Sequence, residues 1–312
     1  MKLRMHSLCW LCLFLICLSV FPLHTQASAT SYYMGHVTWN VEDGVATISG
    51  NGYIADYTCP WGLDKTTVTE VIIESGITSI GKGGFQDFIN LEKVTIHEGV
   101  TFMDDFAFQN CRKLESISLP ASLEWIGGKA FHGCTALKSV HLADLEAWCD
   151  VQLEDYNSSP FANFADLYID GQLVTDLVIP EGCETILPSA FRGCRSLETV
   201  YFPDGLKEIG KGAFFQCYKL KRISLPGSVA SIRSSAFNEC VQLRTVMYRG
   251  RISQLRKLYI SASSENALLN VRWQMSTSYV LLISTVIHLI GVGIPVGFVF
   301  LVLYIRRKRR GY

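Results

Sequence analysis

The chain has 312 residues, with 28 basic and 28 acidic side chains and a formal net charge of zero. Hydrophobic residues make up 49% and charged residues 18%, which is too apolar for a disordered protein and too neutral for a typical nucleic-acid-binding protein. The charges are unevenly placed, because residues 31–190 hold 7 basic and 23 acidic residues, whereas residues 191–278 hold 14 basic and 5 acidic residues. Such a split concerns partners and orientation rather than fold, and we expect no nucleic-acid partner.

Residues 1–29 have the features of a secretory signal peptide. The basic residues Lys2 and Arg4 precede an apolar run, and an A-x-A cleavage pattern ends at Ala29. The apolar run, at residues 8–23, is short for a membrane-spanning helix. We therefore expect residues 1–29 to be removed and the remaining chain to be exported.

Residues 30–66 are expected to form a β-hairpin capping module. Asp43-Gly44 is a typical hairpin turn, and it lies between two runs in which apolar and polar residues alternate. A module of this kind would cover the exposed first coil of the repeat array that follows.

Residues 67–247 contain a sequence repeat with a period of 23. Its clearest markers are two triplets of phenylalanine with a spacing of 23, namely Phe85, Phe108 and Phe131, then Phe191, Phe214 and Phe237. Five of these are followed three positions later by a cysteine: Cys111, Cys134, Cys194, Cys217 and Cys240. The unit reads L-x-x-V-x-I-P-x-x-V-x-x-I-G-x-x-A-F-x-x-C-x-x. A unit this short cannot bury its own apolar face, so neighbouring units must stack.

Each unit is predicted to form one coil of a solenoid. The segment L-x-x-V-x-I gives a short strand whose apolar side chains point inward, and a following proline ends it. The segment A-F-x-x-C is expected to be one short helical turn that inserts the phenylalanine into the core. Strands about 4.8 Å apart then form a parallel β-sheet along one face. The predicted fold class is therefore an α/β-type solenoid.

The repeat resembles the BspA-like leucine-rich repeat family, also called the Treponema-pallidum-type repeat. The resemblance is closest in SLPASLEWIGGKAFHGCTALKSVHL (118–142) and SLPGSVASIRSSAFNECVQL (224–243), and it extends over nearly all of residues 36–273. Residues 37–62 look like the N-terminal module of that family, and residues 248–273 look like its C-terminal capping unit. The resemblance implies leucine-rich repeats and a role in adhesion or recognition, without naming a ligand.

One interval breaks the period of the repeat. The positions of Phe131 and Phe191 differ by 60, which is two periods plus 14. We therefore expect a long repeat with an insertion at residues 143–166, a variant that also occurs in the family that the chain resembles.

The C-terminal segment is predicted to anchor the protein in a membrane. After a cap and juxtamembrane segment at 248–278, residues 279–305 carry no charged side chain and are long enough to cross ~30 Å of hydrocarbon as one transmembrane helix. Five basic residues follow in the tail 306–312 and would hold it in the cytoplasm. We thus expect a cell-surface protein with a single span and with residues 30–278 outside the cell.

Eight cysteines remain after the expected signal peptide. The five at the repeat position are predicted to be buried, unpaired thiols, and Cys183 fills an apolar repeat position in the same way. Cys59 and Cys149 lie outside the pattern and are the one plausible bridge or reactive pair, so their bridging is left open. Asn157 begins a glycosylation sequon, which matters only in a host that glycosylates.

The motifs that could carry catalysis are explained by the repeat. Residues 76–82 look like a phosphate-binding loop, but residues 205–211 show the same pattern at the same phase of the repeat. The adjacent acids at 104–105 and 154–155 are expected to be solvated turn charges. We expect no catalytic residue, no cofactor and no metal site, and hence no enzyme.

The candidate binding surface is the set of strand residues that point away from the core. In repeat order, its two rows are Glu70, Lys93, Ser116, Ser139, Asp176, Thr199, Arg222 and Thr245, and Ile72, Thr95, Ser118, His141, Val178, Tyr201, Ser224 and Met247. The side chains most able to anchor a partner are His141, Tyr201, Arg222 and Met247. The alternative is a merely solvated face rich in serine and threonine.

A second candidate surface is a basic patch next to the expected span, made of Arg244, Arg249, Arg251, Arg256 and Lys257. It would face an anionic bilayer or wall polymer. The function implied by the family resemblance is adhesion to, or recognition of, host, matrix or cell-surface molecules, with an extracellular protein or glycan as the ligand. The alternative is an envelope-organising protein that binds glycans or wall polymers.

Overall fold

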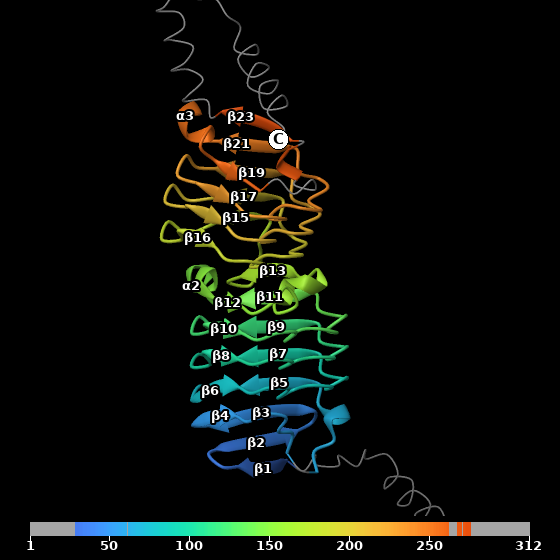
Figure 1. The fold of residues 1–312 in the computed structure, drawn as a ribbon. Coiled ribbons are helices and arrows are strands. Elements are labelled where there is room, and N and C mark those ends of the chain that lie inside the picture. The colour runs from blue at the N-terminus through green and yellow to red at the C-terminus, as the bar shows by residue number, and fades with distance from the viewer. Residues whose placement is uncertain (1–28, 61, 262–266, 270, 276–312) are drawn as a thin grey trace, which may run out of the picture.

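The chain winds into an elongated stack of coils, with the N-terminal coils at one end and the C-terminal coils at the other (Figure 1). The structure is a computed structural model that describes residues 29–60, 62–261, 267–269 and 271–275. The coils fall into a first half, residues 30–173, and a second half, residues 176–275, because each half has its own pair of sheets.

The first half contains a nine-stranded sheet and a five-stranded sheet. In spatial order the nine strands are β1 (Thr30–Met34), β2 (Val37–Glu42), β3 (Val45–Gly50), β5 (Glu70–Ile73), β7 (Lys93–Ile96), β9 (Ser116–Leu119), β11 (Ser139–Leu142), β13 (Asp166–Ile169) and β14 (Gln172–Leu173). The five strands of the other sheet are β12 (Gln152–Leu153), β10 (Trp125–Ile126), β8 (Phe102–Met103), β6 (Ile77–Ile80) and β4 (Gly52–Ile54).

The second half repeats this plan with a five-stranded sheet and a four-stranded sheet. The five strands are β15 (Asp176–Val178), β17 (Thr199–Tyr201), β19 (Arg222–Leu225), β21 (Thr245–Tyr248) and β23 (Arg272–Met275). The four strands are β16 (Thr185–Ile186), β18 (Glu208–Ile209), β20 (Ser231–Ile232) and β22 (Tyr259–Ile260).

The strands of successive repeats pair in parallel at the period that the sequence predicts. Lys93 of β7 lies beside Ser116 of β9, which lies beside Ser139 of β11, and each step advances the chain by one repeat. The second half keeps the same register, with Arg222 of β19 beside Thr245 of β21. The predicted parallel-sheet solenoid is therefore confirmed.

The predicted helical turn at A-F-x-x-C is wrong, because this segment folds as successive turns. The backbone N–H of Phe108 donates to the carbonyl of Ala130 in the next coil at 2.9 Å, and that of Asn110 donates to His132 at 2.8 Å. These N–H groups are used between coils, so they cannot close a helix within one coil. The described helices lie outside the regular repeats: α2 (Leu145–Asp150), α3 (Ile252–Leu255), and the 3₁₀ turns η1 (Lys65–Thr67), η2 (Pro160–Asn163) and η3 (Ala267–Leu269).

A ladder of phenylalanine rings runs through the core of both halves. Successive rings stack nearly parallel, with centroids 5.8 Å apart for Phe108 and Phe131 and 5.4 Å apart for Phe214 and Phe237. Between the two triplets, the fully buried Phe161 takes the place of a ladder residue and lies 6.2 Å from Phe191 at a tilt of 31°. The hydrophobic core is therefore continuous although the sheets are not.

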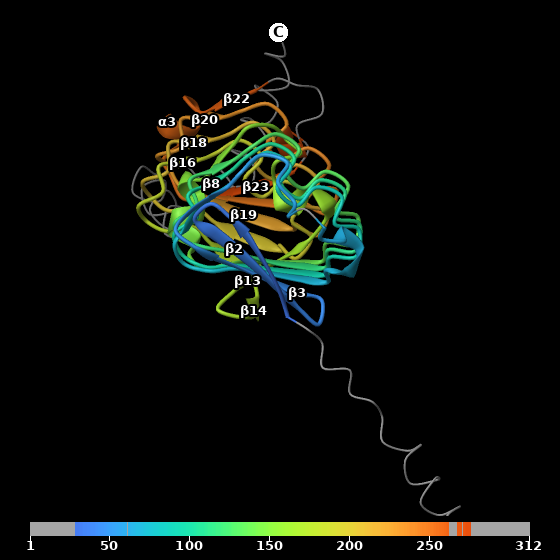
Figure 2. The same ribbon diagram turned by 90° about the horizontal axis from the view of Figure 1, so that it is seen from below.

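The sheets are interrupted at the junction between the first and second halves, because the chain turns back after β13. Strand β14 pairs antiparallel with β13, with Leu173 opposite Tyr168, and so occupies the edge on which β15 would otherwise pair. The β13–β14 hairpin extends beyond the outline of the neighbouring coils when the stack is viewed along its axis (Figure 2).

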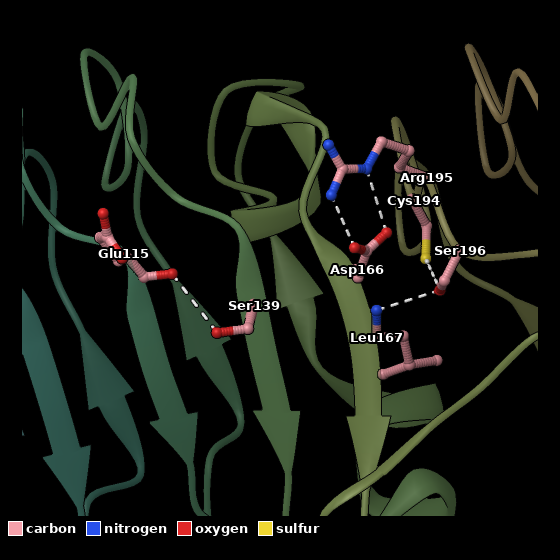
Figure 3. Close-up of polar contacts among 7 residues, drawn as sticks. All are labelled: Glu115, Ser139, Asp166, Leu167, Cys194, Arg195 and Ser196. Atoms are coloured by element: carbon pink, nitrogen blue, oxygen red, sulfur yellow. Dashed lines mark hydrogen bonds and ion pairs between the residues drawn. The ribbon is translucent and has the colours of Figure 1, made fainter.

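Side-chain contacts replace strand pairing across the junction (Figure 3). The Nε and Nη2 atoms of Arg195 donate to the two carboxylate oxygens of Asp166 at 3.1 and 2.6 Å. The hydroxyl of Ser196 accepts from the backbone N–H of Leu167 at 3.1 Å, and it lies 3.6 Å from the Cys194 sulfur. Arg195 and Ser196 of the second half thus hold strand β13 of the first.

Three predicted segments lie wholly or almost wholly outside the described residues. These are the signal peptide, described only at residue 29, the transmembrane segment 279–305 and the basic tail 306–312. Among the residues that the structure describes, no helix has the length and apolar character needed to cross a membrane.

Candidate functional site

Alternate residues in the nine-stranded sheet of the first half and in the five-stranded sheet of the second half point away from the core. We call the surface that they form the outer face. Strand register places the predicted rows on this face and adds Asp166 and Tyr168 from β13 and Arg272 and Gln274 from β23. The period of the repeat does not predict that Asp166 and Tyr168 lie on the outer face, because β13 follows the insertion. Its pairing with Ser139 and His141 of β11 therefore spans more than one regular period.

Two residues of the predicted rows are not available to a partner. Thr199 and Ser224 are only 3% and 6% exposed, although their register places them on the outer face. The Nη2 atom of Arg222 lies 3.4 Å from the Thr199 hydroxyl and bonds to it, so the longer side chain covers its shorter neighbour. The accessible outer face is therefore made by the long side chains of the rows.

His141, a predicted anchor, is used within the outer face of the first half. Its ring stacks on Tyr168 of the next strand, with centroids 4.8 Å apart and an interplanar angle of 22°. Partial burial lowers the pKa of His141, which favours the neutral form of the imidazole. His141 and Tyr168 together form a half-buried aromatic pair rather than a single free anchor.

Charged side chains on the outer face of the first half are paired. Lys93 lies 2.8 Å from Glu70 on the neighbouring strand. Asp166 is held by Arg195 in the two-bond contact across the junction. The excess of acidic residues in the first half is therefore not concentrated as free charge on this face.

The outer face of the second half presents exposed apolar side chains. Val178, Tyr201 and Met247 are 64%, 42% and 39% exposed, and they share one row. We call these three residues the apolar strip. Two arginines of the adjacent row, Arg222 and Arg272, are also exposed. Among the described strands, the other exposed large apolar side chains on the outer face are Tyr33, at the N-terminal end in β1, and Leu173, opposite Tyr168 in β14.

The residues of the predicted basic patch differ in the contacts that they make. Arg249 forms an ion pair with Asp204 at 2.7 Å and also donates to the carbonyl of Phe202. Arg244 donates to the carbonyl of Val241 at 2.7 Å. Arg251 begins helix α3, where the Gln254 side chain accepts from its backbone N–H at 2.7 Å. Arg256 and Lys257 are exposed, as are Arg244 and Arg251, whereas Arg249 is partly buried.

The motifs that resembled catalytic features serve the repeat. Lys82, at the end of the segment 76–82 that resembles a phosphate-binding loop, forms an ion pair of 3.2 Å with Asp105 of the next coil. Asp155 accepts from the Asn157 backbone N–H at 2.7 Å and shapes that turn. Within the described ranges, no group of three or more His, Cys, Asp and Glu side chains is placed to hold a metal ion.

The cysteines outside the repeat are arranged differently from the prediction. Cys59, between β4 and η1, contacts the carbonyl of Leu63 at 3.9 Å, whereas Cys149 lies on α2 beside Cys183. All eight described cysteines are free thiols, so Cys59 and Cys149, whose bridging the sequence left open, are not bridged. The repeat cysteines are buried as expected, and the Cys134 thiol donates to the carbonyl of Phe108 at 3.1 Å.

These features define a leucine-rich-repeat solenoid with one open sheet face. Residues 63–168 and 167–272 match the family model of the BspA type leucine rich repeat region, with six copies of the repeat. The chain therefore belongs to the BspA-type leucine-rich repeat family, as the sequence resemblance predicts.

Similar solved structures are bacterial leucine-rich repeat proteins. One from Eubacterium ventriosum is 22% identical over 72% of this chain and 73% of that chain, with a TM-score of 0.37. The T. pallidum leucine-rich repeat protein is 20% identical over 74% and 86% of the two chains, with a TM-score of 0.37. A leucine-rich cell surface protein from Faecalibacterium prausnitzii is 18% identical over 76% and 99%, with a TM-score of 0.28. At such low TM-scores these likenesses support no statement about a ligand.

No curated protein sequence matches the chain significantly. The family membership and the open sheet face together indicate a role in binding or recognition.

Proposed function

We propose that the protein recognises an extracellular macromolecule through the outer face of its second half. The observation that carries this proposal is the apolar strip of Val178, Tyr201 and Met247, flanked by Arg222 and Arg272. Exposed tyrosine, methionine and arginine side chains are the types enriched at protein interfaces, where a few of them carry most of the binding energy. An open β-sheet face holds them at fixed spacing before a ligand arrives, so little ordering is required on binding.

The ligand that best fits this surface is a protein with an acidic and apolar patch. The segment 191–278 carries 14 basic and 5 acidic residues. Two of its arginines lie on the row next to the apolar strip, and that row also carries the exposed Asp176 on the strand of Val178. Such a surface attracts negative charge and buries apolar side chains at the same time. A glycan ligand would rely on hydroxyl contacts and on aromatic rings, of which the strip offers only Tyr201.

We also propose that this recognition takes place at the cell surface and results in adhesion. The support comes from the sequence, because residues 1–29 have the pattern of an export signal and residues 279–305 are apolar enough to anchor the chain. The proposed role is binding without catalysis; several charged groups on the coils are used in ion pairs, such as Lys207 with Glu184 at 2.5 Å. The envelope-organising role is an outcome of the test below.

The test measures binding of the full-length chain in detergent to arrays of purified extracellular proteins and of purified polysaccharides. Binding to an acidic protein is expected, and the double variant Tyr201→Ala/Met247→Ala should weaken it at least about tenfold, since buried anchors of this kind each contribute on the order of 1–2 kcal/mol. The matched control is Tyr33→Ala, which removes an exposed tyrosine from the outer face of the first half and should bind normally.

Two results would contradict the proposal. Equal binding by the double variant and the unmodified chain would exclude the apolar strip as the binding surface. Binding confined to anionic polysaccharides, and lost when Arg256 and Lys257 are changed to Gln, would favour the envelope-organising role instead.

A further inference from the structure

The five-stranded sheet of the first half carries a row of uncharged side chains that the proposed function does not use. Its strands β4, β6, β8, β10 and β12 follow one another along the stack (Figure 1). The last residue of each strand packs against the core, and the residue before it faces outward. Strand register places the outward residues side by side, and we call them the aromatic row: Tyr53, Ser79, Phe102, Trp125 and Gln152.

The aromatic rings of this row are accessible and ordered. Tyr53 is 66% exposed, Phe102 is 40% exposed, and Trp125 is partly exposed. The rings of Phe102 and Trp125 stack with their centroids 6.1 Å apart and their planes only 4° from parallel. Pairing of β8 with β10 fixes this spacing, so the two rings form a rigid column that requires little ordering when a ligand binds.

Ser79 leaves a gap in the row between Phe102 and Tyr53. Trp125 stacks on one side of Phe102, and the neighbour on its other side is Ser79, which has no ring to stack on it. Tyr53 lies beyond Ser79, two strands from Phe102, which corresponds to about 10 Å at the usual strand spacing. Because atoms in contact lie about 3.5–4.0 Å apart, this gap has room for one six-membered ring between the two aromatic side chains.

The polar groups of the row are neutral. The Ser79 hydroxyl lies at the base of the gap, and the exposed Gln152 amide lies beside Trp125. Tyr53 adds a phenolic hydroxyl at the other end of the row. Hydroxyl and amide groups both donate and accept hydrogen bonds, and no charged side chain belongs to the row. The row therefore combines aromatic rings with neutral hydrogen-bonding groups.

The equivalent row of the second half has a different character. Its described members are Thr185, Glu208, Ser231 and Tyr259. The Glu208 carboxylate is charged and accepts from the Ser231 hydroxyl at 2.8 Å and from Nε of Arg233 at 2.7 Å. The same coil geometry thus forms without stacked rings at these positions, so the solenoid does not require the aromatic row of the first half.

We propose that the aromatic row binds a neutral, linear glycan, with one sugar ring inserted between Tyr53 and Phe102 above Ser79. The C–H groups on the faces of a sugar ring pack against the negative faces of aromatic rings. The hydroxyls at the rim of the sugar can then bond to Ser79 and Gln152. An acidic glycan would find no cation in this row, and the acidic protein proposed for the outer face of the second half would find no arginine.

A linear polymer fits because the row runs along the axis of the solenoid. Each residue of the row comes from a different coil, and successive coils are about 4.8 Å apart. Consecutive sugars of an extended chain therefore meet consecutive coils. The aromatic row lies on a different sheet from the apolar strip, so this inference does not rest on the proposed function.

The experiment uses the full-length chain in a detergent without a sugar head group, since such a head group would compete for the site. It is titrated with linear hexasaccharides of glucose, of N-acetylglucosamine, of mannose and of xylose. Calorimetry measures the dissociation constant, and saturation-transfer NMR identifies the sugar protons that contact the protein. We expect at least one hexasaccharide to bind, with the strongest transfer to ring C–H protons. Absence of binding by all four would overturn the proposal.

Two variants test the gap itself. Phe102→Ala removes one wall and should weaken binding at least about tenfold. Ser79→Phe keeps every ring but fills the gap, and it should abolish binding while the thermal midpoint stays close to that of the unmodified chain. The matched control is Tyr259→Ala, an exposed aromatic residue in the equivalent row of the second half, which should bind normally. Undiminished binding by Ser79→Phe would overturn the proposal.

Further measurements separate this site from the apolar strip. The double variant Tyr201→Ala/Met247→Ala should bind the hexasaccharide as the unmodified chain does, and loss of binding there would move the glycan to the apolar strip and overturn the proposal. An acidic protein should bind Phe102→Ala normally. If Phe102→Ala lost the protein and kept the glycan, the aromatic row would be a protein interface, which would also contradict the proposal.

Discussion

The two halves of the solenoid share one core but differ in their outer faces. The ring stack of Phe108 on Phe131 in the first half is matched by that of Phe214 on Phe237 in the second, each within about half an ångström of the same spacing. On the outer face, by contrast, the first half pairs His141 with Tyr168, whereas the second half leaves Tyr201 exposed.

This difference shows which positions of a repeat protein are constrained and which can vary. An inward side chain must fit both neighbouring coils, so a change in one repeat is felt by the next. An outward side chain meets only its neighbours along the sheet and can vary without disturbing the stack. Binding specificity can therefore develop in one half while the core stays the same in both.

The largest expected effect comes from the ring ladder. Phe214→Ala, within a regular triplet, should cost roughly 3–5 kcal/mol in the free energy of unfolding, the usual range for a truncated core aromatic. Phe161→Ala should cost a similar amount and should also uncouple the halves, because Phe161 of the first half packs against Phe191 of the second half and against Trp148. Urea unfolding followed by tryptophan fluorescence is expected to show one transition for Phe214→Ala and two for Phe161→Ala.

The control for this comparison is Ser118→Ala on the outer face, which should change stability by less than about 0.5 kcal/mol. A single, equally shifted transition for both phenylalanine variants would mean that the halves are held together by contacts other than the ladder.

A substitution at Gly193 tests how closely the two halves approach each other at the junction. Gly193 has φ +78°, and a Cβ there would collide with the carbonyl oxygen of Phe161. Gly193→Ala should therefore combine backbone strain with a clash and cost about 2–4 kcal/mol. Gly171, with φ +71° and open space around it, is a matched control that meets strain alone, of about 1–2 kcal/mol. Thermal unfolding of the two variants measures the difference, and equal losses would show that the junction can relax.

The ion pairs provide a smaller test of the same comparison. Arg195→Ala removes the two-bond contact with Asp166 across the junction and should cost about 1 kcal/mol. Lys138→Ala removes a single-bond pair with Glu115 between regular coils, where both side chains are more than half exposed, and should cost less than about 0.5 kcal/mol. Denaturant midpoints that rank these variants in the opposite order would show that the junction does not rely on Asp166.

The smallest effect concerns acid stability in the second half. Hydrogen bonds from Arg233 and Ser231 lower the pKa of Glu208 below its ordinary value of 4.5. The folded-state pKa is depressed, so this stabilisation is fully present above about pH 4.5 and is lost as the pH falls through the folded value. Glu208→Gln should flatten the decrease in thermal midpoint between pH 5 and 3, and Arg233→Gln should do the same. An unchanged pH profile in both variants would show that the ion pair does not couple to folding.

The sequence predicted the repeat and its consequences well, but it could not predict the junction. The spacing of Phe85, Phe108 and Phe131 was sufficient to place strands in parallel, because each residue contacts its equivalent one period later. The insertion at 143–166 contains no such period. Phe161, within the insertion, and Tyr168, directly after it, therefore gave no signal, although one packs on the ladder and the other completes the outer face.

What the sequence determined by itself is the part of the molecule in which one residue's environment is copied from coil to coil: the inward phenylalanines, the buried cysteines beside them and the register of the sheet. Tertiary structure alone decided the rest. It buried Thr199 and Ser224 although both belong to the outward-facing rows, and it placed Cys149 near Cys183 rather than near Cys59. The physical reason is that these contacts depend on the path of a single non-repeating segment, and a path without periodicity leaves no pattern in the sequence.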